Sequence, residues 1–296
     1  RLTGEQLGLH TGDPHNFTCI EDVMEAVKTQ LLYFIKLLAT EDHIIDVVQS
    51  ELTPHVLVST MIPGCIEKGK DITAGGAIYH TTTPFGAGLA TATDSLAAIK
   101  KAVFEDRSVS MDELLHALDT DFEGMEGEKI RQKLLATPKF GNDDDYVDEF
   151  ARFLTDTFMK EVETYESGRG GHLVGGFFTL SSTVPLGHET PATPNGRKAR
   201  TPISDSVSPT NGVEENGPTA VLNSAAKIDH SRCAAGNAVN IKFSPGALES
   251  AGKFEKFANL ITAYLIDMHG FEVQINVVSA DTLRAAQKNP AEYRDL

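Results

Sequence analysis

The chain has 296 residues, of which 41% are apolar, and a formal net charge of −16. This composition is typical of a globular protein with one large domain or two ordinary ones. The negative charge argues against a nucleic-acid partner; no apolar run is long enough to cross a bilayer, and no secretory leader is visible, so we expect a cytoplasmic protein.

The first half of the chain is expected to be mainly helical. Residues 1–18 are rich in Gly, Thr, Pro and His, which indicates a loop. Ser110 is expected to be the N-cap of a helix, because acidic residues follow it. Apolar spacing, helix starts and turn formers predict helices over residues 20–38, 41–48, 55–62, 94–104, 126–136 and 144–163, turns over residues 64–76, and a strand over residues 77–83.

Strands and helices alternate in the second half. Residues 173–184, LVGGFFTLSSTV counted from Leu173, are rich in aromatic and β-branched residues and predict a buried strand. Residues 185–218 are rich in Pro and Gly and predict a long ordered loop. Helices are expected over residues 219–228, 246–268 and 280–287, and strands over residues 239–243 and 272–278. This alternation predicts α/β architecture, and we see no internal domain boundary in residues 1–296.

The three cysteines, Cys19, Cys65 and Cys233, lie far apart. An odd number at such spacing argues against a disulfide framework and suits a reducing cytoplasm. None belongs to a Cys-x-x-Cys pair, and the ten histidines show no metal-ligand spacing. Three adjacent carboxylates, Asp143–Asp145, cannot all face one ion and are expected to form a solvated, capped helix start. We therefore expect no metal site.

The most informative segment is residues 75–99, GGAIYHTTTPFGAGLATATDSLAAI. It contains a Gly-Gly pair, a β-rich run, a Gly-x-Gly turn and a helix that opens at residues 93–95. Backbone amides near a helix start attract anions, so a phosphate-binding α/β enzyme is one alternative; nucleotides would then raise its melting temperature. The segment lacks the Gly-Lys-Ser/Thr ending of a P-loop and the spacing of a dinucleotide fingerprint.

Other motifs follow in a fixed order: residues 8–14 (GLHTGDP), 64–71 (GCIEKGKD), 140–148 (FGNDDDYVD), 184–187 (VPLG), 192–199 (ATPNGRKA), 216–220 (NGPTA) and 271–278. Together with residues 75–99, this series resembles the glycyl radical enzymes, the family of pyruvate formate-lyase and the glycerol and choline lyases. The resemblance covers nearly the whole chain. One departure is Phe140, where the family has Tyr before Gly-Asn-Asp-Asp.

The resemblance implies an α/β fold that is part of a ten-stranded barrel surrounded by helices, with residues 1–296 as a partial domain, and it implies a homodimer. It also implies a glycyl radical, installed by a radical S-adenosylmethionine iron–sulfur activating enzyme, and a cysteine thiyl radical that takes hydrogen from a small-molecule substrate. Such chemistry needs a closed site from which water is excluded.

Neither radical residue is expected within this sequence. The family's glycine lies in an Arg-Val-x-Gly-Tyr loop, which we expect directly after Leu296. Its cysteine lies in a Gly-Cys-Val-Glu motif, which we expect upstream of residues 8–14. Cys65 lies in a similar Gly-Cys-Ile-Glu run but is expected to be an ordinary buried or loop cysteine, with Glu67 facing solvent. We therefore predict no catalytic residue in this chain.

Substrate contacts are the functional element that we expect here. Side chains alternate between the two faces of a strand. The more polar face of the strand over residues 175–183 consists of Phe177, Thr179, Ser181 and Thr183. The other face consists of Phe178, Leu180, Ser182 and Val184. The resemblance suggests a pocket wall, so we expect Phe177, Thr179, Ser181 and, on the strand before the Gly-x-Gly turn, Tyr79 to contact substrate; the alternative is plain barrel packing.

We therefore expect part of a lyase or dehydratase that eliminates water or another group from a small polar substrate. The candidate strand has no arginine that could hold an anion, which favours neutral, hydroxylated substrates. Formate C-acetyltransfer and arylacetate decarboxylation remain alternatives. A further alternative is a catalytically inactive truncated chain, or a split subunit whose glycine loop comes from a separate protein. A Gly-x-Ser-x-Gly elbow for Ser-His-Asp catalysis is absent from the sequence.

Overall fold

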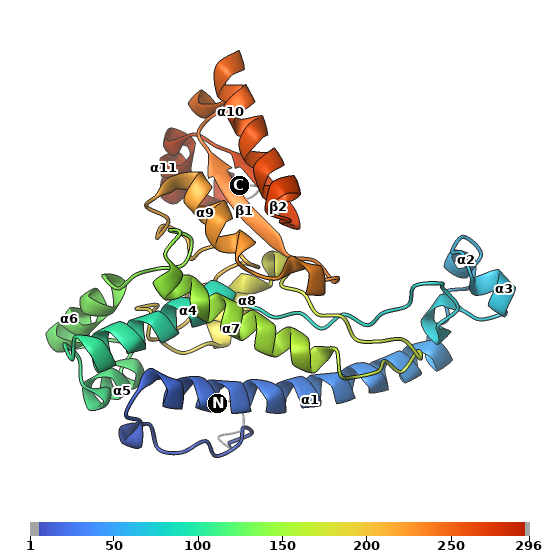
Figure 1. Cartoon of the computed structure of the whole chain (residues 1–296), viewed down its shortest axis with the longest axis horizontal. Helices are drawn as coiled ribbons and strands as arrows, with labels where there is room; N and C mark the ends of the chain where they lie inside the picture. The colour runs from blue at the N-terminus through green and yellow to red at the C-terminus, as the bar shows by residue number, and fades with distance from the viewer. Residues whose placement is uncertain (1–5, 294–296) are drawn as a thin grey trace.

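The computed structural model describes residues 6–293, without the side chain of Leu180. Figure 1 shows a layer of long helices below a smaller sheet unit, which lies near the C-terminus. The helices are α1 (Ile20–Leu52), α2 (Val56–Ser59), α3 (Cys65–Lys68), α4 (Leu89–Ala98), α5 (Met111–Asp119), α6 (Gly124–Leu135), α7 (Asp145–Val162), α8 (Thr183–Glu189), α9 (Gly217–Ala226), α10 (Ala251–Thr262) and α11 (Ala280–Lys288). The strands are β1 (Ala238–Phe243) and β2 (Glu272–Val277), and π-helical turns follow α4 (Ile99–Glu105) and α10 (Ala263–Asp267).

Helix α1 merges the two helical pieces predicted over residues 20–38 and 41–48. No Gly or Pro interrupts residues 20–52, so nothing breaks the backbone hydrogen bonds of the helix. The helix ends at Leu52, because Pro54 disfavours the helical conformation for the residue before it, Thr53. Helix α2 is only one turn long, so the helix predicted over residues 55–62 is largely wrong.

The core lies where α4 and α7 pack on α1 (Figure 1). Small side chains on α4 (Ala90, Ala97 and Ala98, each 0% exposed) allow close approach to the aromatic face of α7. Helix α4 begins at Leu89, because Gly88 takes the left-handed conformation with φ 75°. The predicted helix start at residues 93–95 is therefore wrong by one turn, and Asp94 lies in the middle of a buried helix.

Four extended segments run parallel to one another. Single bridges join Thr82 to Leu173, Phe85 to Gly176 and Phe177 to Asn237, and β1 pairs with β2 from Ala238↔Glu272 to Phe243↔Val277. The strands predicted over residues 77–83 and 173–184 thus shrink to isolated bridges. Pro84 has no N–H group for a ladder, and the pair Gly175–Gly176 disfavours a regular strand.

The α/β class is confirmed. Helix α10 connects β1 to the parallel strand β2, which makes a β-α-β unit. Within residues 6–293 the only regular sheet has two strands, so the ten-stranded barrel itself is not present in the described part of the chain. None of the helices in that part has the length and apolarity of a membrane span.

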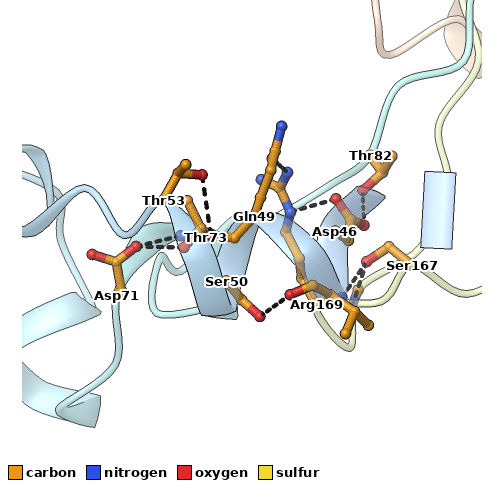
Figure 2. A network of polar contacts seen from close by, with 11 residues as sticks. Asp46, Gln49, Ser50, Thr53, Asp71, Thr73, Thr82, Ser167 and Arg169 are labelled. Carbon is orange, nitrogen blue, oxygen red and sulfur yellow. Dashed lines mark hydrogen bonds and ion pairs between the residues drawn. The ribbon is translucent and has the colours of Figure 1, made fainter. Parts of the chain in front are cut away.

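A buried polar network fixes the start of these segments (Figure 2). Asp46 on α1 is 1% exposed and accepts hydrogen bonds from Arg169 Nε at 2.7 Å and from Thr82 Oγ1 at 2.6 Å. Arg169 also donates to Gln49 Oε1 at 2.8 Å. The Asp46 carboxylate therefore joins α1 to the loop that precedes Leu173 by an ion pair, and to the segment around Thr82 by a hydrogen bond.

Replacing Gly176 with Ala is expected to lower the free energy of unfolding by about 2 kcal/mol. A Cβ atom there would lie 2.5 Å from Gly236 O and 2.9 Å from Ala235 Cβ, and a paired backbone cannot move away easily. The matched control is Gly252→Ala on α10, where a Cβ meets nothing within 4 Å, so a gain of about 0.5–1 kcal/mol is expected. Urea denaturation of both variants measures this; equal midpoints would contradict the predicted close approach.

Candidate active site

A polar pocket of about 520 Å³ opens beside the sheet unit. Its walls come from the start of α8, the loop of residues 205–218, the first turn of α9 and the two strands. The polar side chains that line it are Thr183, Asp205, Ser208, Asn211, Glu214, Asn240, Lys242 and Asn276. Hydroxyl and amide groups predominate, with one lysine and two carboxylates and no arginine, so the pocket suits a small polar molecule.

Asp205 is the most strongly held side chain of this pocket. Thr179 Oγ1 donates to Asp205 Oδ1 at 2.5 Å, and Ser206 Oγ donates to the same oxygen at 2.8 Å. On the other oxygen, Asp205 Oδ2 accepts from the amide of Asn240. These donors orient the carboxylate, and an ionised carboxylate has lone pairs for a further donor.

Ser206 has the strained backbone of this cluster. Its φ is 47°, in the left-handed region that costs a non-glycine residue roughly 1 kcal/mol. The cost is offset by hydrogen bonds, because Ser206 N donates to Thr179 Oγ1 at 2.7 Å and Thr179 N donates to Ser206 Oγ at 3.2 Å. Strained residues of this kind occur preferentially at functional sites.

The two strands present a polar face to the pocket. Asn240 and Lys242 alternate with Val239 and Ile241, which are buried in the core, although Ile241 also borders the pocket. Asn276 on β2 lies beside Asn240, with its amide nitrogen 3.5 Å from Asn240 Oδ1. Because side chains of a strand alternate between its faces, the β1–β2 pair contributes a polar wall on one side and core packing on the other.

The extended segment that follows Leu173 ends before Thr179, whose φ of −91° and ψ of −18° are helical. Residues 180–182 form a 3-10 turn and α8 follows, because Ser182 N donates to Thr179 O at 2.9 Å and Pro185 fits the first turn of a helix. Strand alternation therefore fails after Thr179, and Ser181 and Thr183 do not continue one face of a strand. The aromatic and β-branched composition of the segment concealed this change.

The structure does not bring the four expected contact residues together. Phe177 is 5% exposed and packs on Phe158, with ring centroids 5.3 Å apart. Thr179 is 4% exposed and lies behind Asp205, whereas Ser181 is exposed. Tyr79 is 91% exposed, in a bend of the chain before His80.

Sequence reasoning missed Asp205, Asn240 and Lys242. Asp205 lies in a loop of Ser, Pro and Asp residues, where a carboxylate is common and gives no periodic signal. Asn240 and Lys242 did carry a signal, because polar residues alternate with Val239 and Ile241 within a predicted strand.

The other sequence motifs have structural roles. Asp144 caps α7 by accepting from Tyr146 N at 3.0 Å, as predicted for the acidic run. That run is also paired, because Lys227 Nζ lies 2.9 Å from Asp143 and 2.8 Å from both Asp145 and Asp148. In the described part of the chain, no three His, Cys, Asp or Glu residues are grouped as metal ligands.

Cys65 is buried at 3% exposure, as predicted. Glu67 is exposed, and its Oε2 accepts from Gly64 N at 2.9 Å, which caps the short helix α3. This capping bond explains the spacing of the Gly-Cys-Ile-Glu run without a catalytic role.

A second titratable cluster lies beyond the loop of residues 205–218. Asp94 is fully buried, and burial raises the pKa of its carboxyl to about 7, although Phe140 N donates to it at 2.8 Å and Thr210 Oγ1 at 3.1 Å. Burial lowers the pKa of the neighbouring Lys139 to about 8. Lys139 Nζ has three oxygen partners of its own, so these groups are part of the core.

Comparison with known proteins defines the class. The pyruvate formate lyase-like family model matches residues 1–187, and the glycine radical model matches residues 203–296. The chain belongs to the glycyl radical enzyme family, in its pyruvate formate lyase-like group.

Several relatives are similar over the whole chain. Trans-4-hydroxy-L-proline dehydratase of Clostridioides difficile is 39% identical over 100% of this chain and 37% of its own length. The glycerol-bound B12-independent glycerol dehydratase of Clostridium butyricum has a TM-score of 0.91 and 40% identity, over 99% of this chain and 37% of its own. A solved structure described for 1,2-propanediol dehydration in Roseburia inulinivorans has a TM-score of 0.93 and 40% sequence identity. The match covers 99% of this chain and 38% of that one. This chain thus spans less than two-fifths of each relative.

Proposed function

We propose that this chain forms one wall of the substrate chamber of a glycyl radical dehydratase or lyase. The observation on which this depends is the match of both family models, together with a fold shared with enzymes that dehydrate glycerol and 1,2-propanediol. The substrate is a small, neutral, hydroxylated molecule, because the pocket is lined mainly by hydroxyl and amide groups, and its single lysine is outnumbered by two carboxylates and joined by no arginine.

The four parallel segments are the part of a ten-stranded barrel that this chain supplies. The whole protein has a glycyl radical installed by a radical S-adenosylmethionine activating enzyme, acts as a cytoplasmic homodimer, and relays the radical through a cysteine. Asp205 and Asn240 contact the substrate and Thr179 orients Asp205. The contacts expected at Phe177, Ser181 and Tyr79 stay predictions.

Exposed apolar side chains support a larger protein. Beyond the end of α1, Leu57 is 75% exposed, Met61 67% and Ile66 69%, and Leu52 on α1 itself is 73% exposed. A monomeric surface rarely gathers so many large apolar groups. Relatives that are more than twice as long as this chain have further residues that can cover such a surface.

The test uses the protein encoded by the whole reading frame. Anaerobic treatment with an activating enzyme, S-adenosylmethionine and a reductant is expected to give the doublet electron spin resonance signal of a glycyl radical. Turnover is then assayed with glycerol, propane-1,2-diol, trans-4-hydroxy-L-proline and the anion isethionate. The variant Asp205→Asn is expected to keep the radical signal and to lose roughly tenfold to a hundredfold in kcat/KM, because a charged acceptor becomes neutral.

The exposed Asp281→Asn, on α11, is the matched control and is expected to keep full activity. A protein that gains no radical signal would contradict the proposed function and would favour an inactive chain. A radical enzyme that is unaffected by Asp205→Asn would remove the pocket from the proposal, and a preference for isethionate would contradict the proposed substrate class.

A further inference from the structure

A buried hydrogen-bond relay connects α9 to the segment that bears Thr179. His230 Nε2 lies 2.9 Å from Ala225 O, and His230 Nδ1 lies 3.2 Å from Asn237 Nδ2. Asn237 Oδ1 accepts from Phe177 N at 2.9 Å. His230 is 5% exposed and Asn237 is 0% exposed, so water does not replace these bonds.

The backbone at both ends sets the direction of the relay. Ala225 O can only accept, so the proton of the neutral imidazole is on Nε2, and Nδ1 is left as an acceptor. Phe177 N–H can only donate, so the amide oxygen of Asn237 faces it and the amide nitrogen faces His230. Only this tautomer and this amide orientation satisfy all three bonds.

We propose that His230 is a positioning residue that acts through Asn237. It holds Phe177 in place against the start of β1, and so sets where Thr179, two residues later, meets Asp205 at the pocket. The consequence for substrate binding rests on the proposed function, whereas the effect on the segment around Phe177 does not.

The fold does not depend on this relay alone. Phe177 N–H is shared, because it also donates to Gly236 O at 2.9 Å, so loss of the Asn237 bond is expected to weaken the backbone pairing here without removing it. The His230 ring also packs edge-on against Tyr264, with ring centroids 6.2 Å apart. A purely structural role for His230 would therefore depend on its ring, whereas the proposed role depends on the acceptor at Nδ1.

Two matched variants separate these roles, since both remove the ring. In His230→Asn the shorter amide can place its oxygen near the Nδ1 position, which keeps the acceptor for Asn237. In His230→Gln the longer amide reaches the Nε2 position, which keeps the bond to Ala225 O and loses the acceptor. The measurements are hydrogen exchange by mass spectrometry in peptides that span residues 174–180, and KM and kcat for whichever diol or hydroxyproline the whole protein consumes.

We expect His230→Asn to exchange at nearly the wild-type rate and to keep KM within about threefold. His230→Gln is expected to exchange roughly tenfold faster at residues 174–180. It is also expected to raise KM about tenfold, which corresponds to about 1.4 kcal/mol, with a smaller change in kcat. Equal exchange in the two variants would overturn the proposal. Because exchange is measured without turnover, this comparison still decides the proposal if the assay finds no activity.

Discussion

Replacing Arg169 with Met is expected to lower the free energy of unfolding by about 3–5 kcal/mol, because it leaves a buried carboxylate without its ionic partner. Asp46 is 1% exposed, and the variant keeps only the neutral donor Thr82 Oγ1, while Gln49 Oε1 also loses its partner. The hydrocarbon of Met fills much of the volume of the arginine stem, so the loss reports mainly on charge. Urea denaturation measured at neutral pH gives the size of the effect.

Two comparisons support the interpretation of that experiment. Arg284→Met removes an ion pair with Asp281 on α11, where the two side chains are 70% and 93% exposed, so a change of no more than about 0.5 kcal/mol is expected. Adding Asp46→Asn to Arg169→Met is expected to recover part of the loss, because the uncompensated charge disappears. A loss below about 1 kcal/mol for Arg169→Met would contradict the predicted dependence of the buried Asp46 carboxylate on its ion pair.

Local signals in the sequence predicted most of the helical fold. Ser110 caps α5 as predicted, since its hydroxyl accepts from Glu113 N at 3.2 Å. Helices α6 and α7 begin and end within two residues of their predicted bounds. Caps, first-turn acids and apolar spacing act within one or two turns of the chain, so a single sequence contains this information.

Long-range contacts could not be predicted in the same way. The strand predicted over residues 173–184 keeps only isolated bridges and ends in a 3-10 turn and a helix. Thr179, where the turn begins, is held by Asp205 and Ser206, which lie 26 and 27 residues away. The candidate site depends on the same contacts, since Asp205 meets Asn240 from a distant strand. The family resemblance indicated the class of protein, but it indicated neither the segments nor the side chains that line the pocket.

Replacing Asp94 with Asn is expected to stabilise the protein by about 2–4 kcal/mol at pH 7.5 and to have little effect near pH 4. Burial raises the pKa of Asp94 from 3.8 to about 7 in the folded protein. Between these pH values the folded state holds a proton that the unfolded chain has released. The stability that the protonated carboxyl contributes is therefore complete below pH 3.8 and is lost as pH rises towards 7.

An asparagine at this position carries no charge at any of these pH values. Its amide oxygen can accept from Phe140 N as Asp94 does, and Thr210 can turn its hydroxyl to accept from the new amide. Burial lowers the pKa of Lys139 to about 8, above the pH range of the experiment, so Lys139 stays mainly charged while Asp94 titrates, and its charge opposes part of the rise in the Asp94 pKa. The difference in unfolding free energy between wild type and Asp94→Asn should therefore grow steadily from pH 4 to pH 7.5.

The measurement is a series of urea denaturation curves across that pH range, with the exposed Asp281→Asn as the control that is expected to show no such trend. A difference that is constant with pH would mean that Asp94 has the same charge in the folded and the unfolded protein at every pH tested. The buried carboxylate would then have to be stabilised by Lys139 in addition to its hydrogen bonds. The slope against pH, rather than the stability at any one pH, decides between these two states of the buried carboxyl.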